Sequence, residues 1–126
     1  MLSMEDKNSK YNLENRLIAF AVSILDLADK LPNTFAGKHL GGQLTRSGTS
    51  PALNYGEAQA AESRADFIHK MKICLKELRE SQICLKIIEQ RVMVQKEISE
   101  PVLKECSELV AIFTKSIETT KNNIHK

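Results

Sequence analysis

Residues 63–94, SRADFIHKMKICLKELRESQICLKIIEQRVMV, carry the clearest structural pattern in this chain. Apolar side chains recur there in steps of four and three, with one serine among them, which is the spacing of a single buried helix face. The positions are Phe67, Met71, Cys74, Leu78, Ser81, Leu85, Ile88 and Val92. Ser63 followed by Asp66 has the pattern of a capping box. We therefore expect a helix over about 64–94.

A second apolar face precedes this helix, over residues 12–31. Asn12 is a good N-cap, and Pro32 stops the helix because a residue before proline disfavours helical angles. The inner face consists of Leu13, Leu17, Phe20, Ala21, Ile24, Ala28 and Leu31. The pattern predicts a helix over about 12–31, after a flexible polar tail over residues 1–11.

Residues 35–62 permit two interpretations. One is a long kinked helix capped by Asn33 or Thr34, and the other is two short helices, of which the second restarts at Thr49 or Ser50. The residues that weaken a continuous helix are Gly41, Gly42, Gly48 and Pro51. We favour a near-continuous helix that is disturbed around residues 48–51.

A fourth helix is predicted over about 99–121, with Ser99 as its N-cap and Pro101 in its first turn. A short connection over residues 95–97 precedes it. Its inner face consists of Val102, Cys106, Leu109, Phe113 and Ile117. Four amphipathic helices with short connections predict an all-α fold, an antiparallel up-down four-helix bundle, as a single domain over residues 1–126.

Composition narrows the cellular setting. No apolar run approaches the roughly 20 residues of a membrane span, and the first ten residues lack the apolar core of a signal peptide. We expect a cytoplasmic protein without a membrane partner. The three cysteines, Cys74, Cys84 and Cys106, form no metal-binding pattern and are expected to be buried, reduced thiols. No metal and no cofactor is predicted.

The net charge of +2 is unevenly distributed. Residues 64–96 carry 8 basic and 4 acidic side chains, and the excess falls along one predicted helix face. That face carries His69, Lys72, Lys76, Arg79, Lys86 and Gln90, with Ile83 between them. A line of cations one helical turn apart can follow a phosphate backbone. The alternative is a solvated face whose lysines pair with Glu77, Glu80 and Glu89.

Polar residues of the second helix allow two further interpretations. If the helix continues through Pro51, Arg46 and Glu57 share a face and can form a cluster with Asn54. Glu57 would then be either a general base near Arg46 or part of a polar network that fixes a helix contact. We favour the network, and we predict no catalytic residue.

The sequence between Gly37 and Glu80 resembles a known family. RSGTS, NYGEA, DFIHK and KELRE occur there in this order, and this arrangement is similar to the four-helix-bundle proteins encoded in intervening sequences of bacterial 23S rRNA genes. That family is similar in turn to the accessory variability protein of diversity-generating retroelements. The family's recurrent positions fall on Arg46, Ser50, Asn54, Glu57, Phe67, Glu77 and Glu80. We expect the polar ones to form one structural polar cluster: Arg46, Ser50, Asn54, Glu57, Glu77 and Glu80. Pro51 departs from the aliphatic residue that is usual there.

The resemblance implies a left-handed up-down bundle that assembles as a homopentamer, has a basic surface thought to bind nucleic acid, and has no established enzymatic activity. Together with the basic face, it predicts a non-enzymatic oligomeric protein that binds nucleic acid, RNA in preference to DNA. A protein is a further candidate partner. The alternative is a structural homo-oligomeric scaffold that binds a protein. An RNA-processing nuclease is a third hypothesis, without a supporting set of residues.

Overall fold

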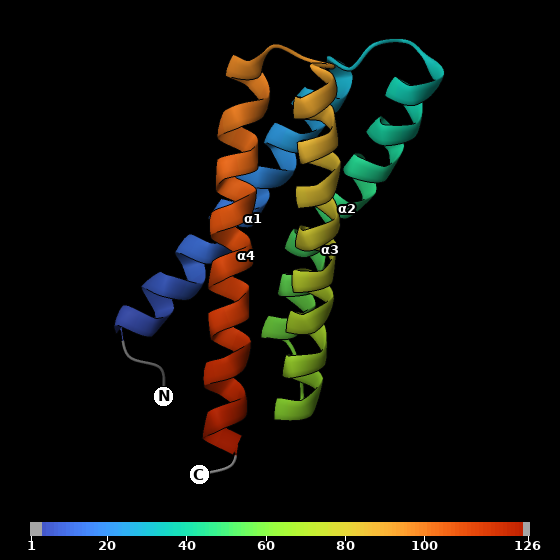
Figure 1. Ribbon diagram of the computed structural model, residues 1–126. Helices are drawn as coiled ribbons and strands as arrows, with labels where there is room; N and C mark the ends of the chain where they lie inside the picture. The colour runs from blue at the N-terminus through green and yellow to red at the C-terminus, as the bar shows by residue number, and fades with distance from the viewer. Residues whose placement is uncertain (1–3, 125–126) are drawn as a thin grey trace.

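The computed structural model describes the backbone of residues 4–124 and the side chains of residues 12–122. It consists of four helices: α1 (Met4–Asp29), α2 (Phe35–Gln59), α3 (Arg64–Arg91) and α4 (Lys96–Ile124). Successive helices run antiparallel (Figure 1), and the α1–α2 and α3–α4 connections lie at the same end of the bundle. Each helix packs on its neighbours in the order α1, α2, α3, α4, and α4 returns to α1. The predicted all-α, up-down four-helix bundle is confirmed.

The seam predicted for α3 forms the centre of the core. The Ser63 hydroxyl accepts a hydrogen bond from the Asp66 backbone N–H at 3.0 Å, so the predicted cap is present. The buried positions of the seam are Met71, Cys74, Leu78, Ser81, Leu85 and Ile88. Ser81 is the polar member of this seam, and its hydroxyl lies 2.9 Å from the hydroxyl of buried Ser47 on α2. The hydroxyl pair therefore satisfies two polar groups inside the core.

The end of α3 differs from the prediction. The helix stops at Arg91 rather than at residue 94, and Val92 adopts a left-handed backbone conformation with φ of 52°. The Met93 N–H donates to the Ile88 carbonyl at 3.0 Å, and the Val92 N–H donates to the Glu89 carbonyl at 3.1 Å. This is a Schellman end. It exposes 72% of Val92, which the periodicity places on the seam, and turns Val94 inward.

The start of α1 also differs. The helix begins at Met4, eight residues before Asn12, so the predicted flexible tail is helical over residues 4–11. Residues 1–3 of that tail lie outside the described residues. No glycine or proline occurs between Met4 and Asn12, so nothing in the local sequence forces the helix to start at Asn12. At its other end α1 stops at Asp29 rather than at residue 31, just before Pro32.

α2 is one helix through residues 48–51, as we favoured, with Pro51 inside it. The Thr34 hydroxyl caps it by accepting from the Gly37 N–H at 3.1 Å. Its first and second halves run in visibly different directions (Figure 1), as expected where proline removes a helical hydrogen bond. The helix ends at Gln59 rather than at residue 62, because Ala60 and Ala61 form the turn before the α3 cap.

α4 begins at Lys96, so Ser99 is inside the helix rather than at its N-cap, and Pro101 lies beyond the first turn. The Gln95 carbonyl instead accepts the first bonds, from the Ile98 N–H at 2.9 Å and the Ser99 N–H at 3.2 Å. Ser99 is thereby turned into the bundle, and its buried hydroxyl has no hydrogen-bond partner among the described residues. The helix continues to Ile124, three residues past its predicted end.

The four helices enclose one core, in which Tyr55 and Phe113 meet edge to face with ring centroids 6.0 Å apart. α1 packs more sparsely on α4 than on α2. Two hydrogen bonds from the Arg16 guanidinium to the Glu105 carboxylate, at 3.0 and 2.6 Å, connect α1 with α4.

Over residues 4–124 we find no helix that combines the length and apolar character needed to cross a membrane.

Candidate nucleic-acid interface

The predicted basic stripe lies on the outer face of α3, opposite the buried seam. Every member of it is exposed: His69, Lys72, Lys76, Arg79 and Lys86. Because α3 is regular from Arg64 to Arg91, positions three or four residues apart stand one turn apart along that face. Ile83, which interrupts the stripe, is 57% exposed. The structure therefore places the five predicted residues on a single continuous surface.

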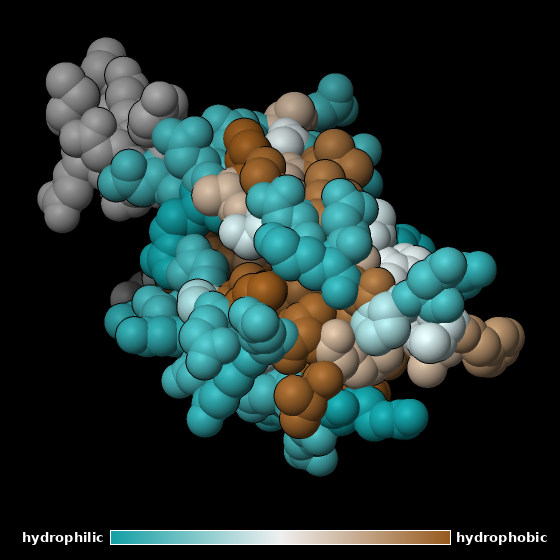
Figure 2. Space-filling view, turned by 90° about the horizontal axis from the view of Figure 1, so that it is seen from above, coloured by the Kyte–Doolittle hydropathy of each residue, from teal (hydrophilic) through white to brown (hydrophobic). Residues whose placement is uncertain are grey.

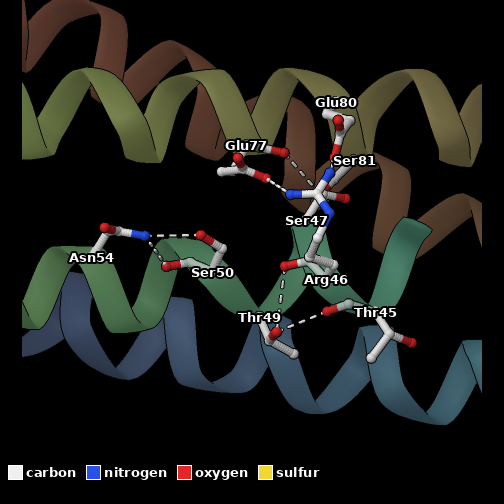
Figure 3. Close-up of polar contacts among 9 residues, drawn as sticks. All are labelled: Thr45, Arg46, Ser47, Thr49, Ser50, Asn54, Glu77, Glu80 and Ser81. Atoms are coloured by element: carbon white, nitrogen blue, oxygen red, sulfur yellow. Dashed lines mark hydrogen bonds and ion pairs between the residues drawn. The ribbon is translucent and has the colours of Figure 1, made fainter. Parts of the chain in front are cut away.

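The stripe is not neutralised by the carboxylates next to it. Among the side chains of residues 12–122, no acidic group lies within 4.0 Å of a cation of the stripe. Glu77 and Glu80, which the alternative interpretation assigns to these lysines, instead bind Arg46 of α2 (Figure 3). The Arg46 guanidinium lies 2.9 Å from the Glu77 carboxylate, and it also donates to Glu80. Two of the three candidate acidic partners are thus already occupied.

The N-terminal part of the stripe borders a shallow open hollow of about 340 Å³. Lys72, Lys76 and Arg79 surround it, and the partly buried Leu75 lies at its side toward the core. Three cations around an apolar floor can contact a sugar–phosphate backbone, because the sugar meets the apolar surface while the phosphates meet the cations.

The residues predicted as one polar cluster divide into three separate groups. Arg46 binds Glu77 and Glu80, and its pKa is raised chiefly by the charge of Glu77. The Asn54 amide donates to the Ser50 hydroxyl at 2.8 Å and to the Ser50 carbonyl at 3.1 Å (Figure 3).

Glu57 belongs to the third group, because its carboxylate lies 3.2 Å from the Lys70 ammonium. The network therefore fastens α2 to α3 at two places, Arg46 and Glu57, rather than at a single cluster. Lys70 was not predicted in this role. The signal was available, since residues 57 and 70 flank the short α2–α3 connection and face each other across it.

The arrangement does not favour acid–base or thiol chemistry at these residues. The general-base interpretation requires Glu57 to lie near Arg46. Instead, its carboxylate pairs with Lys70. All three cysteines are buried, as predicted, and burial raises the pKa of the Cys74 and Cys106 thiols to about 12. Such thiols supply very little thiolate near neutral pH. In the part of the chain that the structure describes, no cluster of three or more metal-ligating side chains is found.

The outer face of α1 carries a second exposed feature, which the sequence analysis missed. Ile18, Val22 and Leu25 are 50%, 52% and 43% exposed and follow one another in steps of four and three. We call these three residues the α1 aliphatic stripe. Their spacing of three and four residues could have predicted this stripe. It was missed because the buried residues of α1 repeat with the same spacing and are sufficient to predict the helix. On α3, Ile83 and Ile87 are also exposed, whereas Ile73 is partly buried.

Hydrophobic groups also reach the surface at the end of the bundle that carries the α1–α2 and α3–α4 connections (Figure 2). They lie in patches between hydrophilic side chains. Phe35 at the start of α2 is 90% exposed, and Val92 at the end of α3 is 72% exposed. Phe35 lies directly after the α1–α2 connection and Val92 lies in the α3–α4 connection, so we attribute their exposure to the geometry of the connections rather than to a site.

Fold and site together define a small all-helical bundle protein that presents exposed cations along one helix. The chain belongs to the family of 23S rRNA-intervening sequence proteins, whose sequence profile matches residues 10–115. It is also similar to a crystal structure from Bacteroides thetaiotaomicron VPI-5482, described as a protein with unknown function from the S23 ribosomal protein family. The two chains are 32% identical over 83% of this chain and 97% of that one, with a TM-score of 0.77. No protein with a curated description matches this chain.

Proposed function

We propose that this chain is a cytoplasmic, non-enzymatic homo-oligomer that binds nucleic acid, RNA in preference to DNA, through the outer face of α3. One observation carries the proposal: His69, Lys72, Lys76, Arg79 and Lys86 are exposed on one face without an acidic partner within 4.0 Å among the described side chains. Cations that are left free can exchange their counterions for phosphates, and this release favours binding.

The dimensions of the stripe fit a polyanion. From His69 to Lys86 the helix rises by roughly 25 Å at about 1.5 Å per residue, which is enough to follow several phosphates. Contacts of this type position the protein on the backbone but carry little sequence information. Stacking platforms for bases would need aromatic side chains, and Tyr55, the tyrosine nearest to the stripe in sequence, is buried in the core. We therefore expect recognition of charge and shape with weak sequence preference.

RNA is preferred over DNA because of the family to which the chain belongs, whose name refers to an intervening sequence of 23S rRNA. Assembly strengthens the proposal, since several weak patches on one particle act at a high effective concentration. The resemblance noted from the sequence makes a pentamer the expected assembly.

The test is a filter-binding titration of structured RNA and duplex DNA at several salt concentrations. In the test variant Lys72→Glu, Lys76→Glu and Arg79→Glu are combined. In the control variant Lys30→Glu, Lys104→Glu and Lys115→Glu are combined, which changes the net charge equally at exposed positions away from the stripe. Each phosphate contact contributes a slope of about −0.9 on duplexes and about −0.7 on single strands in a log–log plot against salt.

We expect the test variant to lose most of its binding and of its salt dependence, and the control variant to keep most of both. Equal binding by the two variants would contradict the proposal, because it would mean that the stripe makes no specific contribution. The scaffold with a protein partner would then be the better interpretation, and the exposed aliphatic residues of α1 and α3 favour it as the second candidate.

A further inference from the structure

On the other side of the bundle lies a second exposed aliphatic stripe. Its charged neighbours are basic, whereas those of the α1 aliphatic stripe are acidic. On α3, Ile83 and Ile87 are 57% and 45% exposed, and exposed Arg79 and Lys86 lie beside them. We call Arg79, Ile83, Lys86 and Ile87 the α3 aliphatic stripe. The aliphatic residues of the α1 stripe span about two helical turns, and those of the α3 stripe span about one turn.

The surroundings of the α1 stripe are acidic. Exposed Glu14 precedes Ile18 by one turn, and exposed Asp26 and Asp29 follow within one turn of Leu25. Between residues 12 and 29 the only cation in the sequence is Arg16, and its guanidinium is turned toward α4, where it binds Glu105 and Glu108. Lys30 follows Asp29 directly, but among the described side chains no ion pair joins it or any other cation to Glu14, Asp26 or Asp29.

The two ridges cannot meet within one molecule. α1 packs on α2 and α4, and α3 packs on the same two helices, so α1 and α3 are diagonal in the bundle. Figure 1 shows α3 toward the viewer and α1 passing behind α4. Their outer faces point away from each other, so contact between them requires two copies of the chain.

We infer that the acidic α1 stripe of one copy docks on the basic α3 stripe of the next copy. Burying two exposed aliphatic ridges is favourable, and the opposite charges at their borders select this pairing. Pairing α1 with α1 would bring Glu14, Asp26 and Asp29 against their own copies. Pairing α3 with α3 would oppose Arg79 and Lys86 in the same way. Like charges thus disfavour both symmetric alternatives.

A contact between two different faces leaves one free face at each end of a dimer. Repetition therefore gives a closed ring or an open chain, but not a two-fold dimer. The inference rests on the homo-oligomer of the proposed function. It also assigns the two ends of the basic stripe on α3 to different partners. Ile83, Lys86 and Ile87 face the neighbouring copy, whereas His69, Lys72 and Lys76 remain open for nucleic acid. Arg79 lies at the boundary between the two parts.

The test uses two variants that each damage one face, Val22→Arg on α1 and Ile83→Arg on α3. Both positions are more than half exposed, so the core of each variant is unchanged. Native mass spectrometry and light scattering at micromolar concentration measure the assembly, with one variant uniformly labelled with ¹⁵N. Circular dichroism checks that both variants keep the helical content of the wild type.

We expect each variant alone to be a 14.2 kDa monomer and the equimolar mixture to form a 1:1 heterodimer. The intact α3 face of Val22→Arg can bind the intact α1 face of Ile83→Arg, whereas the two damaged faces repel each other. Formation of that heterodimer from two monomers also excludes misfolding as the cause of lost assembly. Wild type is expected to form a larger particle.

Three outcomes overturn the inference: a monomeric wild type, assembly of either variant alone, or a mixture that stays monomeric. None of these decides the proposed nucleic-acid binding, which is read by filter binding from a variant outside the proposed contact, Lys72→Glu combined with Lys76→Glu. Conversely, normal RNA binding by the Lys72→Glu and Lys76→Glu variant would contradict the proposed function and would not bear on the α1–α3 contact.

Discussion

Val92 holds a backbone conformation that suits glycine better than a β-branched residue. Its φ of 52° places it in the left-handed region at the end of α3, where a residue with a Cβ is disfavoured by about 1–2 kcal/mol. The side chain is 72% exposed, so it recovers little of this cost by burial. The chain accepts the strain because the turn brings Met93 and Val94 back onto the core.

We therefore expect Val92→Gly to raise the free energy of unfolding by about 1 kcal/mol. Chemical denaturation with an unchanged slope would measure it. Val92→Ala is the matched control, since it removes most of the same side chain but keeps the Cβ, and it should change stability much less. If alanine stabilised the protein as much as glycine, the backbone explanation would be wrong.

Sequence periodicity identified individual core residues well and polar contacts poorly. Met71, Leu78 and Leu85 are buried as predicted because a helix fixes which side chains share a face. The same spacing places Val92 on the seam, but spacing determines the face of a residue only within a helix. The helix ends at Arg91, one residue before Val92. Arg46 reaching Glu77 and Glu80 depends on how α2 and α3 are aligned, which no spacing within one helix can specify.

At the scale of helices, Gly48 sets how closely α1 and α2 approach. A Cβ at this position would lie 2.6 Å from both Cγ1 and Cγ2 of Ile24, whose side chain is fully buried. These atoms are near the backbone of α1 and cannot move away independently. The glycine that made a continuous α2 uncertain from sequence is therefore explained by packing between helices.

Gly48→Ala should destabilise the protein by about 1–3 kcal/mol because it overfills a packed contact. Gly42→Ala is the control within the same helix. Nothing lies within 4 Å of a Cβ there, so we expect a gain of about 0.5–1 kcal/mol from helix propensity alone. Thermal or denaturant unfolding compares the two.

In the Gly48→Ala background, Ile24→Ala should cost less than it does in the wild type, because it removes the clashing atoms. Equal costs in the two backgrounds would show that Gly48 is not in steric contact with Ile24.

Helix ends were predicted less accurately than helices. Asn12 and Ser99 are good N-caps by residue type, yet the helices start at Met4 and Lys96. A residue with capping ability caps only if the chain before it leaves the helix, and in both places the preceding residues continue it. Thr34 and Ser63 act as predicted, since each follows a turn that other residues impose.

At the scale of the molecule, the fold could be predicted from the sequence because each helix packs mainly on its neighbour along the chain. Four amphipathic segments with short connections leave few other arrangements. The exposed stripes could not be predicted with the same security. An exposed apolar face that binds a partner and one that binds nothing have the same spacing in the sequence. That α1 and α3 lie on opposite sides of the bundle is known only from the fold.

The order of packing, α1 on α2, α2 on α3 and α3 on α4, also has a kinetic consequence. Contacts between consecutive helices close short loops, and helical bundles of this kind fold in roughly microseconds to milliseconds. In the proposed oligomer, encounter between copies is slower at low concentration, because its rate depends on how often molecules meet. Stopped-flow refolding should therefore show a fast phase independent of protein concentration and a slower phase that accelerates with it. On the proposed assembly, newly made chains would fold before they meet, and the concentration of the protein in the cell would set when the oligomer forms.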